Sequence, residues 1–546
     1  MLPWLACTEP DEPDPRPGRH GSPDDTVETL PANPASVPPD ISFDPAGGVY
    51  VGALDVSLTL SDGASAWYTT DDSLPTTKST PYTAAIALRG GGRLRVLVQG
   101  ANGLQIVASQ SYVSVAPDLA EFDSNLPLVV VRSEGSLPSY GQESFTGVAL
   151  QVHEPGEDGR TPLVGAATVD SRAAMQVRGS STAGNAKASW AVELRAAGDD
   201  GDDDVALLGM PADSDWVLYA PYDFDRALIR NALMFQLSND AGRYAPRTRF
   251  VEVFAVANGE RMDSGDYQGV YTLMERIKRG PDRVDITALG PDDTRPPEVS
   301  GGYLFKRDRV GEDEDGFWAG GDGLSFVDPL IYVDPEEDVI EHQQADYLYT
   351  YIDDFWAALA SGDPAWQDAI DLDSWVDNHI LNLYPKNPDA LRLSQYYYKD
   401  REGPIVAGPL WDFDRTSGCT SDDRAEDPTW WDPSNQTTDT TYMFEYGWYE
   451  SLFNDPTFAA AYWARWDEML DYPLSVEHVN GVIDEMAAEL SEAAPRNYDR
   501  WPEVGPTTGS FEGEIAALED WFDARHAWIA SCLADHPDDP RTCEGD

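Results

Sequence analysis

The most informative part of the sequence is Asn387-Pro388-Asp389, followed further along by Gly408-Pro409-Leu410-Trp411-Asp412-Phe413-Asp414-Arg415-Thr416-Ser417-Gly418. A strand-like run, Ile405–Trp411, leads directly into two aspartates that flank an aromatic residue. Carboxylates at a strand end, beside another carboxylate on a loop, suit Mg²⁺, because this ion prefers hard oxygen ligands and also holds triphosphate oxygens. The pattern therefore indicates an acidic metal site.

Around this stretch, the hydrophobic pattern divides the chain into a strand-rich part and a mostly helical part. Apolar residues at helical spacing predict one helix at Arg226–Asn239, and Asn258-Gly259 favours a hairpin. After about residue 340 the pattern is helical, except at Gln395–Tyr398 and Ile405–Trp411. The strands predicted before that point are Leu128–Val131, Met175–Val177, Trp190–Leu194, Phe250–Val256 and Gly269–Leu273. A small sheet lobe followed by a larger helical lobe would give this order.

Arg178-Gly179-Ser180-Ser181, followed by Lys187, is the first of three weaker motifs. Glycine with small hydroxyl residues after a strand lets backbone N–H groups approach phosphate, and a nearby lysine can neutralise its charge. A plain turn would give the same pattern, so the motif alone does not decide between the two.

The other two motifs lie on the predicted helix and at the end of the predicted hairpin. Asp225-Arg226 and Arg230-Asn231 lie one helical turn apart, which is typical of surface ion pairs. If these residues were buried on the helix, they would be of more functional interest. The hairpin ends in Leu273-Met274-Glu275-Arg276-Ile277. Its backbone could meet an adenine ring as a kinase hinge does, or the segment could simply belong to the core.

Together, the motifs resemble the CotH (spore coat protein H-like) family. The series runs from RGSS…K through the RN helix and the NG…GVY-x-L-x-E hairpin to the D…YYY…WDFD-x-x-SG ending, and Trp521–Arg525 resembles the family's closing helix. The resemblance covers residues 126–536. It implies an α+β, two-lobed, protein-kinase-like domain and an atypical secreted kinase that uses ATP with Mg²⁺ or Mn²⁺.

The resemblance also implies roles for individual residues. Asp389 matches the catalytic-loop aspartate, which orients and deprotonates an acceptor hydroxyl. Asp412 matches the metal-binding aspartate, with Asp414 in support. The family commonly has an asparagine before the aromatic strand, where this chain has the longer Gln395 as a metal ligand. The residues expected around the nucleotide are Arg178, Ser180, Ser181 and Lys187 at the phosphates, and Glu275, Arg276 and Ile277 at the hinge.

Residues 41–116 read as a small all-β, immunoglobulin-like sandwich. Apolar residues alternate in Val56–Leu60 and Leu94–Val98, with glycine-rich turns between the runs. Trp67–Thr76 resembles the chitobiase/hexosaminidase C-terminal domain, although one glycine and one proline of that pattern are replaced. The resemblance implies an accessory module, either a spacer or a contact to glycan or cell wall. We expect this module to fold independently of the rest of the chain.

The charge balance excludes some classes of partner. The 546-residue chain has 97 acidic and 37 basic residues and a formal net charge of −60. Nucleic acid is not an expected partner, because its phosphates would be repelled. Acidic runs such as Asp199–Asp204 are either solvated surface or sites for divalent cations. No run approaches about 18 uninterrupted apolar residues, so we expect no membrane span.

The N-terminal sequence indicates export. Leu5-Ala6-Cys7 resembles the end of a bacterial lipoprotein signal, so residues 1–7 read as a truncated signal. Residues 8–40 are rich in Pro and Asp and read as a disordered tether. We therefore expect an exported lipoprotein at the cell surface or in the periplasm, with a lipid anchor at Cys7. Cys532 and Cys543 close a short loop and could form a disulfide.

The leading function is thus ATP- and metal-dependent phosphorylation of Ser or Thr on an exported protein. The first alternative is a catalytically inactive CotH-like adhesin or coat-assembly protein, since fold does not imply function. A glycan-binding or wall-associated protein would instead depend on residues 41–116. A calcium-binding protein would rest on Asp313-Glu314-Asp315-Gly316, but Gly311 stands where an EF-hand loop needs its first acidic ligand.

Overall fold

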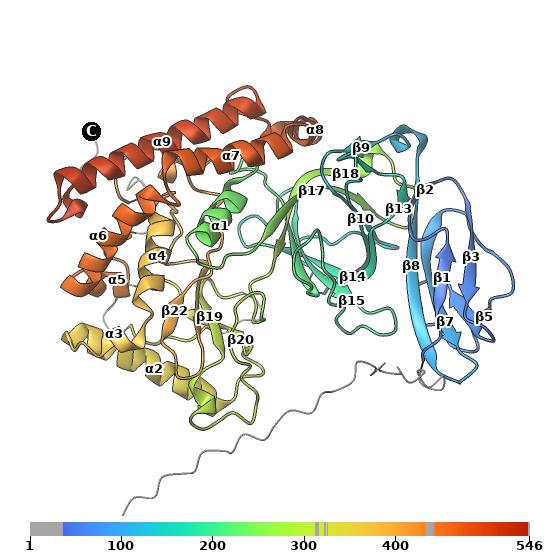
Figure 1. Cartoon of the computed structure of the whole chain (residues 1–546), viewed down its shortest axis with the longest axis horizontal. Helices are drawn as coiled ribbons and strands as arrows, with labels where there is room; N and C mark the ends of the chain where they lie inside the picture. The colour runs from blue at the N-terminus through green and yellow to red at the C-terminus, as the bar shows by residue number, and fades with distance from the viewer. Residues whose placement is uncertain are drawn as a thin grey trace, which may run out of the picture.

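The computed structural model describes residues 37–142, 144–311, 316–321, 324, 326–432 and 442–543. The expected signal with Cys7, most of the tether, and Asp313–Asp315 of the calcium alternative lie outside the described residues. Three parts follow one another along the longest axis of the molecule (Figure 1): an N-terminal β domain, a β-barrel, and a helical part.

The N-terminal β domain consists of two sheets that pack on one another. Its core is formed by the residues that alternate in the sequence, including Val56 and Leu58 from one sheet and Leu94, Val96 and Val98 from the other. One sheet has the order β1(Ile41–Asp44)-β3(Leu54–Leu60)-β6(Ile86–Leu88), and the other has β13(Gly165–Ala166)-β2(Gly48–Val51)-β8(Gln105–Val115)-β7(Gly91–Gln99)-β4(Ser65–Thr69)-β5(Thr80–Pro81). The predicted all-β character of residues 41–116 is confirmed.

This domain packs closely against the barrel, which argues against the expectation that it folds independently. Its larger sheet is completed by β13, which comes after the first barrel strands in the sequence. Val49 and Val113 share one buried cluster with Leu128 and Phe254 of the barrel. The buried Arg93 also donates to the Val148 carbonyl at 2.8 Å. Removing the domain would therefore expose apolar surface and leave polar barrel groups without partners.

The barrel is closed by seven strands. Their order around it is β10(Leu128–Arg132), β11(Thr146–His153), β14(Val169–Arg178), β15(Ser189–Arg195), β16(Asp215–Tyr219), β18(Tyr267–Glu275) and β17(Thr248–Val256). Parallel pairing of β10 with β17 completes the closure. Asn258 and Gly259 both have positive φ (56° and 61°) in a tight turn, closed by the Glu260 N–H and the Ala257 carbonyl, that begins the connection from β17 to β18. The five strands predicted for this part of the chain are confirmed, and β11 and β16 were not predicted.

The helical part is built around α1 and a four-stranded antiparallel sheet. This sheet has the order β20(Leu330–Asp334)-β19(Tyr303–Arg307)-β21(Gln395–Lys399)-β22(Ile405–Ala407). The helices are α1(Arg230–Asp240), α2(His342–Ser361), α3(Trp366–Ala369), α4(Leu372–Leu383), α5(Trp448–Leu452), α6(Pro456–Asp471), α7(Val476–Leu490), α8(Ala493–Arg500) and α9(Phe511–Asp535). A single large core cluster joins them.

Two predicted elements have different bounds in the structure. The helix predicted from Arg226 begins only at Arg230, because Leu228 adopts φ 65° and the Asp225 carboxylate accepts the Arg230 N–H instead. The strand predicted to reach Trp411 ends at Ala407, because Gly408 has φ 122° and turns the chain away. Both shifts occur next to the predicted site residues.

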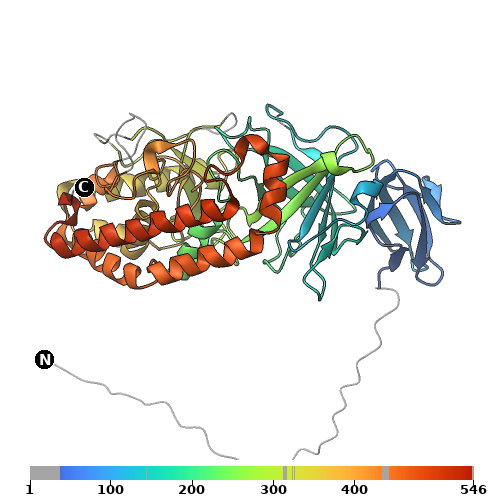
Figure 2. The same ribbon diagram turned by 90° about the horizontal axis from the view of Figure 1, so that it is seen from above.

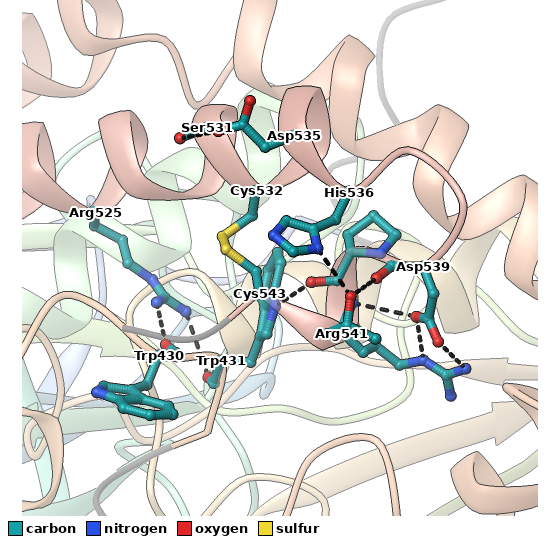
Figure 3. Close-up of a disulfide and its surroundings, with 12 residues drawn as sticks. Trp430, Trp431, Arg525, Ser531, Cys532, Asp535, His536, Asp539, Arg541 and Cys543 are labelled. Atoms are coloured by element: carbon teal, nitrogen blue, oxygen red, sulfur yellow. Dashed lines mark hydrogen bonds and ion pairs between the residues drawn. A yellow bond between two sulfur atoms is a disulfide. The ribbon is translucent and has the colours of Figure 1, made fainter. Parts of the chain in front are cut away.

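The C-terminal helices tie the helical part to the barrel. Figure 2 shows α7 and α9 side by side, with α8 turning toward the barrel, where it lies against β18. Beyond α9, Cys532 and Cys543 form the disulfide that the sequence allowed (Figure 3), and Trp431 donates to the Pro540 carbonyl beside it. In the described part of the chain, no helix combines the length and apolarity that crossing a membrane requires.

Candidate active site

A cleft of about 480 Å³ lies between the barrel and the four-stranded sheet. Its walls come from segments far apart in sequence, and they include Arg178, Gly179, Ser180, Ser181, Tyr219, Asn231, Met274, Lys306, Asp308, Asp389, Tyr396, Trp411, Asp412, Asp414 and Arg415. A larger hollow, about 900 Å³, lies between α1, β17 and α7, but none of the predicted site residues lines it. The 480 Å³ cleft is therefore the candidate active site.

Asp412 and Asp414 face this cleft from either side of the buried Phe413. The cleft walls limit the hydration of Asp412, and repulsion from Asp389 and Asp308 adds to this, so its pKa is raised to about 6. Burial and the neighbouring Asp412 charge also raise the pKa of Asp414. Both shifts mean that the empty site disfavours the ionised carboxyls and that a bound cation would stabilise them.

The backbone at Asp412 is strained, and side chains of neighbouring elements hold it. Asp412 has φ 69°, a conformation that costs of order 1–3 kcal/mol outside glycine. Asn231 of α1 accepts a 2.8 Å hydrogen bond from the Phe413 N–H, and Asn387 donates to the Asp412 carbonyl at 3.2 Å. The loop is therefore fixed on both sides of the aspartate.

The pair Asp225–Arg230 holds the end of the same loop. Its side chains are almost fully buried and lie 2.8 Å apart. Arg230 also donates to the carbonyls of Thr416 and Ser417, at 3.0 and 3.2 Å. The charged motif on the predicted helix is thus a buried support for the aspartate loop rather than a set of surface ion pairs.

Three arginines surround Asp389. Arg392 and Arg424 lie 2.8 and 3.3 Å from Oδ1, whereas the Nε of Arg415 lies 4.0 Å from Oδ2. Arg392 and Arg424 thus orient the carboxylate through Oδ1, and Oδ2 lies on the side of Arg415. Arg415 also lowers the pKa of Asp412 and of Asp414, against the larger effects that raise them.

The glycine-containing motif lies on the opposite wall. Arg178 ends β14 and stacks over Trp411, with its guanidinium carbon 4.9 Å from the ring centroid. Ser180 and Ser181 line the cleft beside it. The structure therefore brings these three predicted phosphate-binding residues together with the aspartates.

Lys187 lies elsewhere, and its predicted phosphate contact is wrong. Its side chain is buried, and Nζ donates to the carbonyls of Pro221 and Val270 and to Asn497 Oδ1 of α8 at 2.9 Å. Burial lowers the pKa of Lys187 well below its usual value, partly opposed by the charge of Asp225. With three protein acceptors, this ammonium group ties α8 to the barrel and does not reach the cleft.

Gln395 also faces away from the cleft. Side chains alternate along β21, so Tyr396 lines the cleft while the buried Gln395 and Tyr397 point into the helical part. The Gln395 amide donates to the Tyr396 carbonyl at 3.2 Å. Its predicted role as a metal ligand is therefore wrong.

The predicted hinge is only partly at the cleft. Met274 lines it, but the buried Glu275 carboxylate pairs with Arg247 at 2.7 Å. The Arg276 carbonyl accepts from Arg283 at 2.9 Å, and Ile277 belongs to a separate apolar cluster. No side chain of Glu275, Arg276 or Ile277 is among the residues that line the cleft in the described structure.

Four of the cleft residues that sequence reasoning missed carry an ionisable group close to the aspartates: Tyr219, Lys306, Asp308 and Arg415. Lys306 and Asp308 lie 3.8 Å apart at the end of β19, in a charged run that reads as a solvated turn. Tyr219 ends β16, and burial together with Asp414, Asp225 and Asp412 raises its pKa. Only Arg415 had a visible signal, because it directly follows Asp414.

The described residues of the cleft do not supply enough protein ligands to hold a metal ion alone. They suit a metal ion whose remaining ligands are phosphate oxygens and water. Among the described residues, no group of three or more His, Cys, Asp or Glu side chains is arranged to hold a metal ion. Two carboxylates with raised pKa values remain, Asp412 and Asp414. Mg²⁺ in nucleotide sites needs only one or two carboxylates, because phosphates and waters complete its shell.

Two known families match parts of the chain. The chitobiase/beta-hexosaminidase C-terminal domain matches residues 45–106, within the N-terminal β domain. The family described as CotH kinase protein matches residues 175–529, from the end of β14 into α9. No curated protein matches the chain. Because the second match covers well over half of the 546 residues, the chain belongs to the CotH kinase protein family.

Proposed function

We propose that the protein transfers the γ-phosphoryl group of ATP to a serine or threonine of an exported protein, with the barrel and the helical part acting as the two lobes of a protein-kinase-like domain. The observation that supports this most is the convergence of Asp389, Asp412 and Asp414 with Arg178 and Ser180–Ser181 in one cleft. Phosphoryl transfer depends mainly on positioning and on charge stabilisation, and this cleft offers groups for both.

In the proposed reaction, Asp389 orients the acceptor hydroxyl and takes its proton as the oxygen attacks the γ-phosphorus. The bond between this phosphorus and the β,γ-bridging oxygen breaks, and ADP leaves with the electron pair. Asp412 and Asp414 would hold Mg²⁺ or Mn²⁺, which supplies charge neutralisation of the phosphate oxygens. Arg178 and the backbone at Ser180–Ser181 would contact the phosphates.

A catalytically inactive binding or coat-assembly protein is the second candidate. Two observations favour this candidate. Lys187 bonds to Asn497 instead of reaching the cleft, and Asp389 is already paired with Arg392 and Arg424. Against it, Lys306 supplies another cation to the described cleft, and the ion pairs of Asp389 fall mainly on one oxygen.

The proposed partners and location rest on the N-terminal sequence and on the resemblance to secreted kinases. We propose export, with a lipid anchor at Cys7, which would place the acceptor protein at the cell surface or in the periplasm. In the N-terminal β domain, every described Trp, Tyr and Phe side chain is buried or half-buried, and its exposed large apolar residues are Val51, Leu74 and Leu104. Without an exposed aromatic surface for a sugar ring, a spacer role is favoured over glycan contact.

The test is incubation of the purified chain with labelled ATP and Mn²⁺, with phosphate incorporation as the readout. Asp389→Asn should bind nucleotide like the parent but transfer about 10²–10⁴-fold more slowly, as expected for loss of a positioned base. Transfer at the parent rate by this variant would remove Asp389 from the reaction. Nucleotide binding without any transfer by the parent would favour the inactive binding protein.

A further inference from the structure

The cleft contains a cation that the proposed reaction does not yet use. Arg415 follows Asp414 in the chain and lines the cleft together with Asp389 and Asp412. Its Nε lies 4.0 Å from Oδ2 of Asp389, and its side chain is 24% exposed. The guanidinium is therefore accessible from the cleft and close to the carboxylate that would face the acceptor hydroxyl.

Three contacts fix the direction of the Arg415 side chain. It pairs with Asp422 at 3.2 Å, lies over the Phe224 ring at 3.8 Å from the centroid, and donates to Ser181 Oγ at 3.3 Å. Ser181 belongs to the motif proposed to cover the phosphates. A guanidinium held by an aromatic face and an ion pair has already lost much of its rotamer freedom, so little further ordering is needed to bind phosphate.

The other cations near Asp389 occupy different positions. Arg424 pairs with the same two carboxylates, Asp389 at 3.3 Å and Asp422 at 2.6 Å, but its side chain is buried and does not line the cleft. Arg392 contacts Oδ1 and likewise does not line it. Within the described structure, Arg415 is thus the cleft-lining cation that also reaches Asp389.

Resting on the proposed function, we infer that Arg415 is a catalytic residue that binds the γ-phosphoryl group and stabilises the charge that develops on it during transfer. For attack, the acceptor oxygen must lie about 3–3.5 Å from phosphorus and about 2.6–3.2 Å from the base. A guanidinium 4.0 Å from that base therefore has the phosphoryl oxygens within its reach. The proton still passes to Asp389 and the leaving electrons to ADP; Arg415 contributes only charge and hydrogen bonds.

This contact predicts a difference between ATP and ADP, because only ATP has the γ-phosphate. Affinities for both nucleotides with Mn²⁺, and the rate of transfer, would be measured for the parent, Arg415→Gln and Arg415→Lys. The parent should bind ATP more tightly than ADP. Arg415→Gln should lose this preference and lower kcat by about 10³-fold, the lower end of what an arginine contributes to phosphoryl transfer. Arg415→Lys should keep part of the preference.

Arg424→Gln is the matched control, since Arg424 shares both carboxylate partners of Arg415. It should slow transfer by loosening Asp389 and yet keep the preference for ATP. Guanidine added to Arg415→Ala should restore part of the rate, which it would not do for a variant with a disturbed loop. Thermal melting of each variant checks that it is folded.

The outcomes separate this inference from the proposed function. A parent that binds neither nucleotide overturns both. A parent that prefers ATP, with the same preference in Arg415→Gln and Arg415→Lys, overturns the role of Arg415 alone and leaves it as a support for Asp389. If the parent binds ATP without transferring phosphate, the loss of the ATP preference in Arg415→Gln still supports the γ-phosphate contact.

Discussion

Two short charged segments that begin at the cleft, Asp412–Ser417 and Arg178–Lys187, differ in whether their polar residues stay together in space. In the first, the polar residues close in sequence stay close in space, because Asn231 and Arg230 of α1 fix the backbone between them. In the second, Arg178 lies at the cleft, whereas Lys187 is directed to Asn497 of α8. Spacing along a chain predicts a shared site only where the backbone between the residues is held by other contacts.

The largest difference between the two segments should appear when one charge is removed from each. Asp412→Asn should abolish metal-dependent nucleotide binding and leave the fold intact, because a neutral amide cannot replace a carboxylate as a hard anionic ligand. Calorimetry with Mg-ATP measures this loss, and a thermal melt measures the fold. Equal affinities in the variant and the parent would show that Asp412 holds no metal.

Lys187→Met should do the opposite. The Pro221 and Val270 carbonyls would lose a buried donor, at about 1–3 kcal/mol for each group left unsatisfied, whereas Asn497 Oδ1 still accepts from the Val270 N–H. Relief of the buried charge offsets part of this cost. We expect a net loss of roughly 3 kcal/mol in the free energy of unfolding, with nucleotide affinity unchanged in the folded protein. Denaturant unfolding measures the loss.

Lys78→Met is the control for this prediction, because Lys78 is exposed in the N-terminal β domain and its replacement should change stability by less than about 0.5 kcal/mol. If Lys187→Met kept full stability but lost affinity for ATP, Lys187 would belong to the nucleotide site after all, and the contrast between the two segments would disappear.

The features that could be predicted from the sequence are those set by residues close together in the chain. Asp389, Asp412 and Asp414 were assigned to one site from two short motifs, and five of the seven barrel strands were predicted from short apolar or alternating runs and a turn signal. The partners that make the site work lie far away in the chain: Asn231 contacts Phe413, and no local pattern indicates that pairing. Closure of the barrel likewise depends on parallel pairing of β10 with β17, which only the folded chain brings together.

Asn231→Ala tests how much the support of the loop matters. The Phe413 N–H would lose its buried acceptor, so the strained backbone at Asp412 would be less restrained. We expect metal-dependent affinity for ATP to fall by about 10–100-fold, the usual effect of removing a group that orients a metal ligand. Gln236→Ala on the exposed face of the same helix is the control. A loss of stability with unchanged affinity would mean that α1 supports the fold but not the site.

The smallest expected effect is a dependence of metal binding on pH, which only the Asp412 segment should show. Since the pKa of Asp412 is raised to about 6, this carboxyl is protonated below pH 6, and an entering cation must displace the proton. Affinity for Mn-ATP should therefore rise between pH 5 and pH 7, by up to about tenfold per unit below pH 6 for one displaced proton.

The stability of the metal-free protein should change with pH in the opposite direction. The folded state binds more protons than the unfolded chain between the ordinary pKa of aspartate, about 3.9, and the raised value, so the contribution of Asp412 to stability is lost as pH rises through this window. Adding Mn²⁺ and ATP should reverse that loss, because the cation replaces the proton. Melting curves from pH 4 to pH 7, with and without Mn-ATP, measure both effects. Other buried carboxyls, such as Asp414 and Asp170, also have raised pKa values, so the contribution of Asp412 is the difference between the curves of the parent and of Asp412→Asn. A parent whose affinity for Mn-ATP does not change with pH would show that this carboxyl lies outside the metal site.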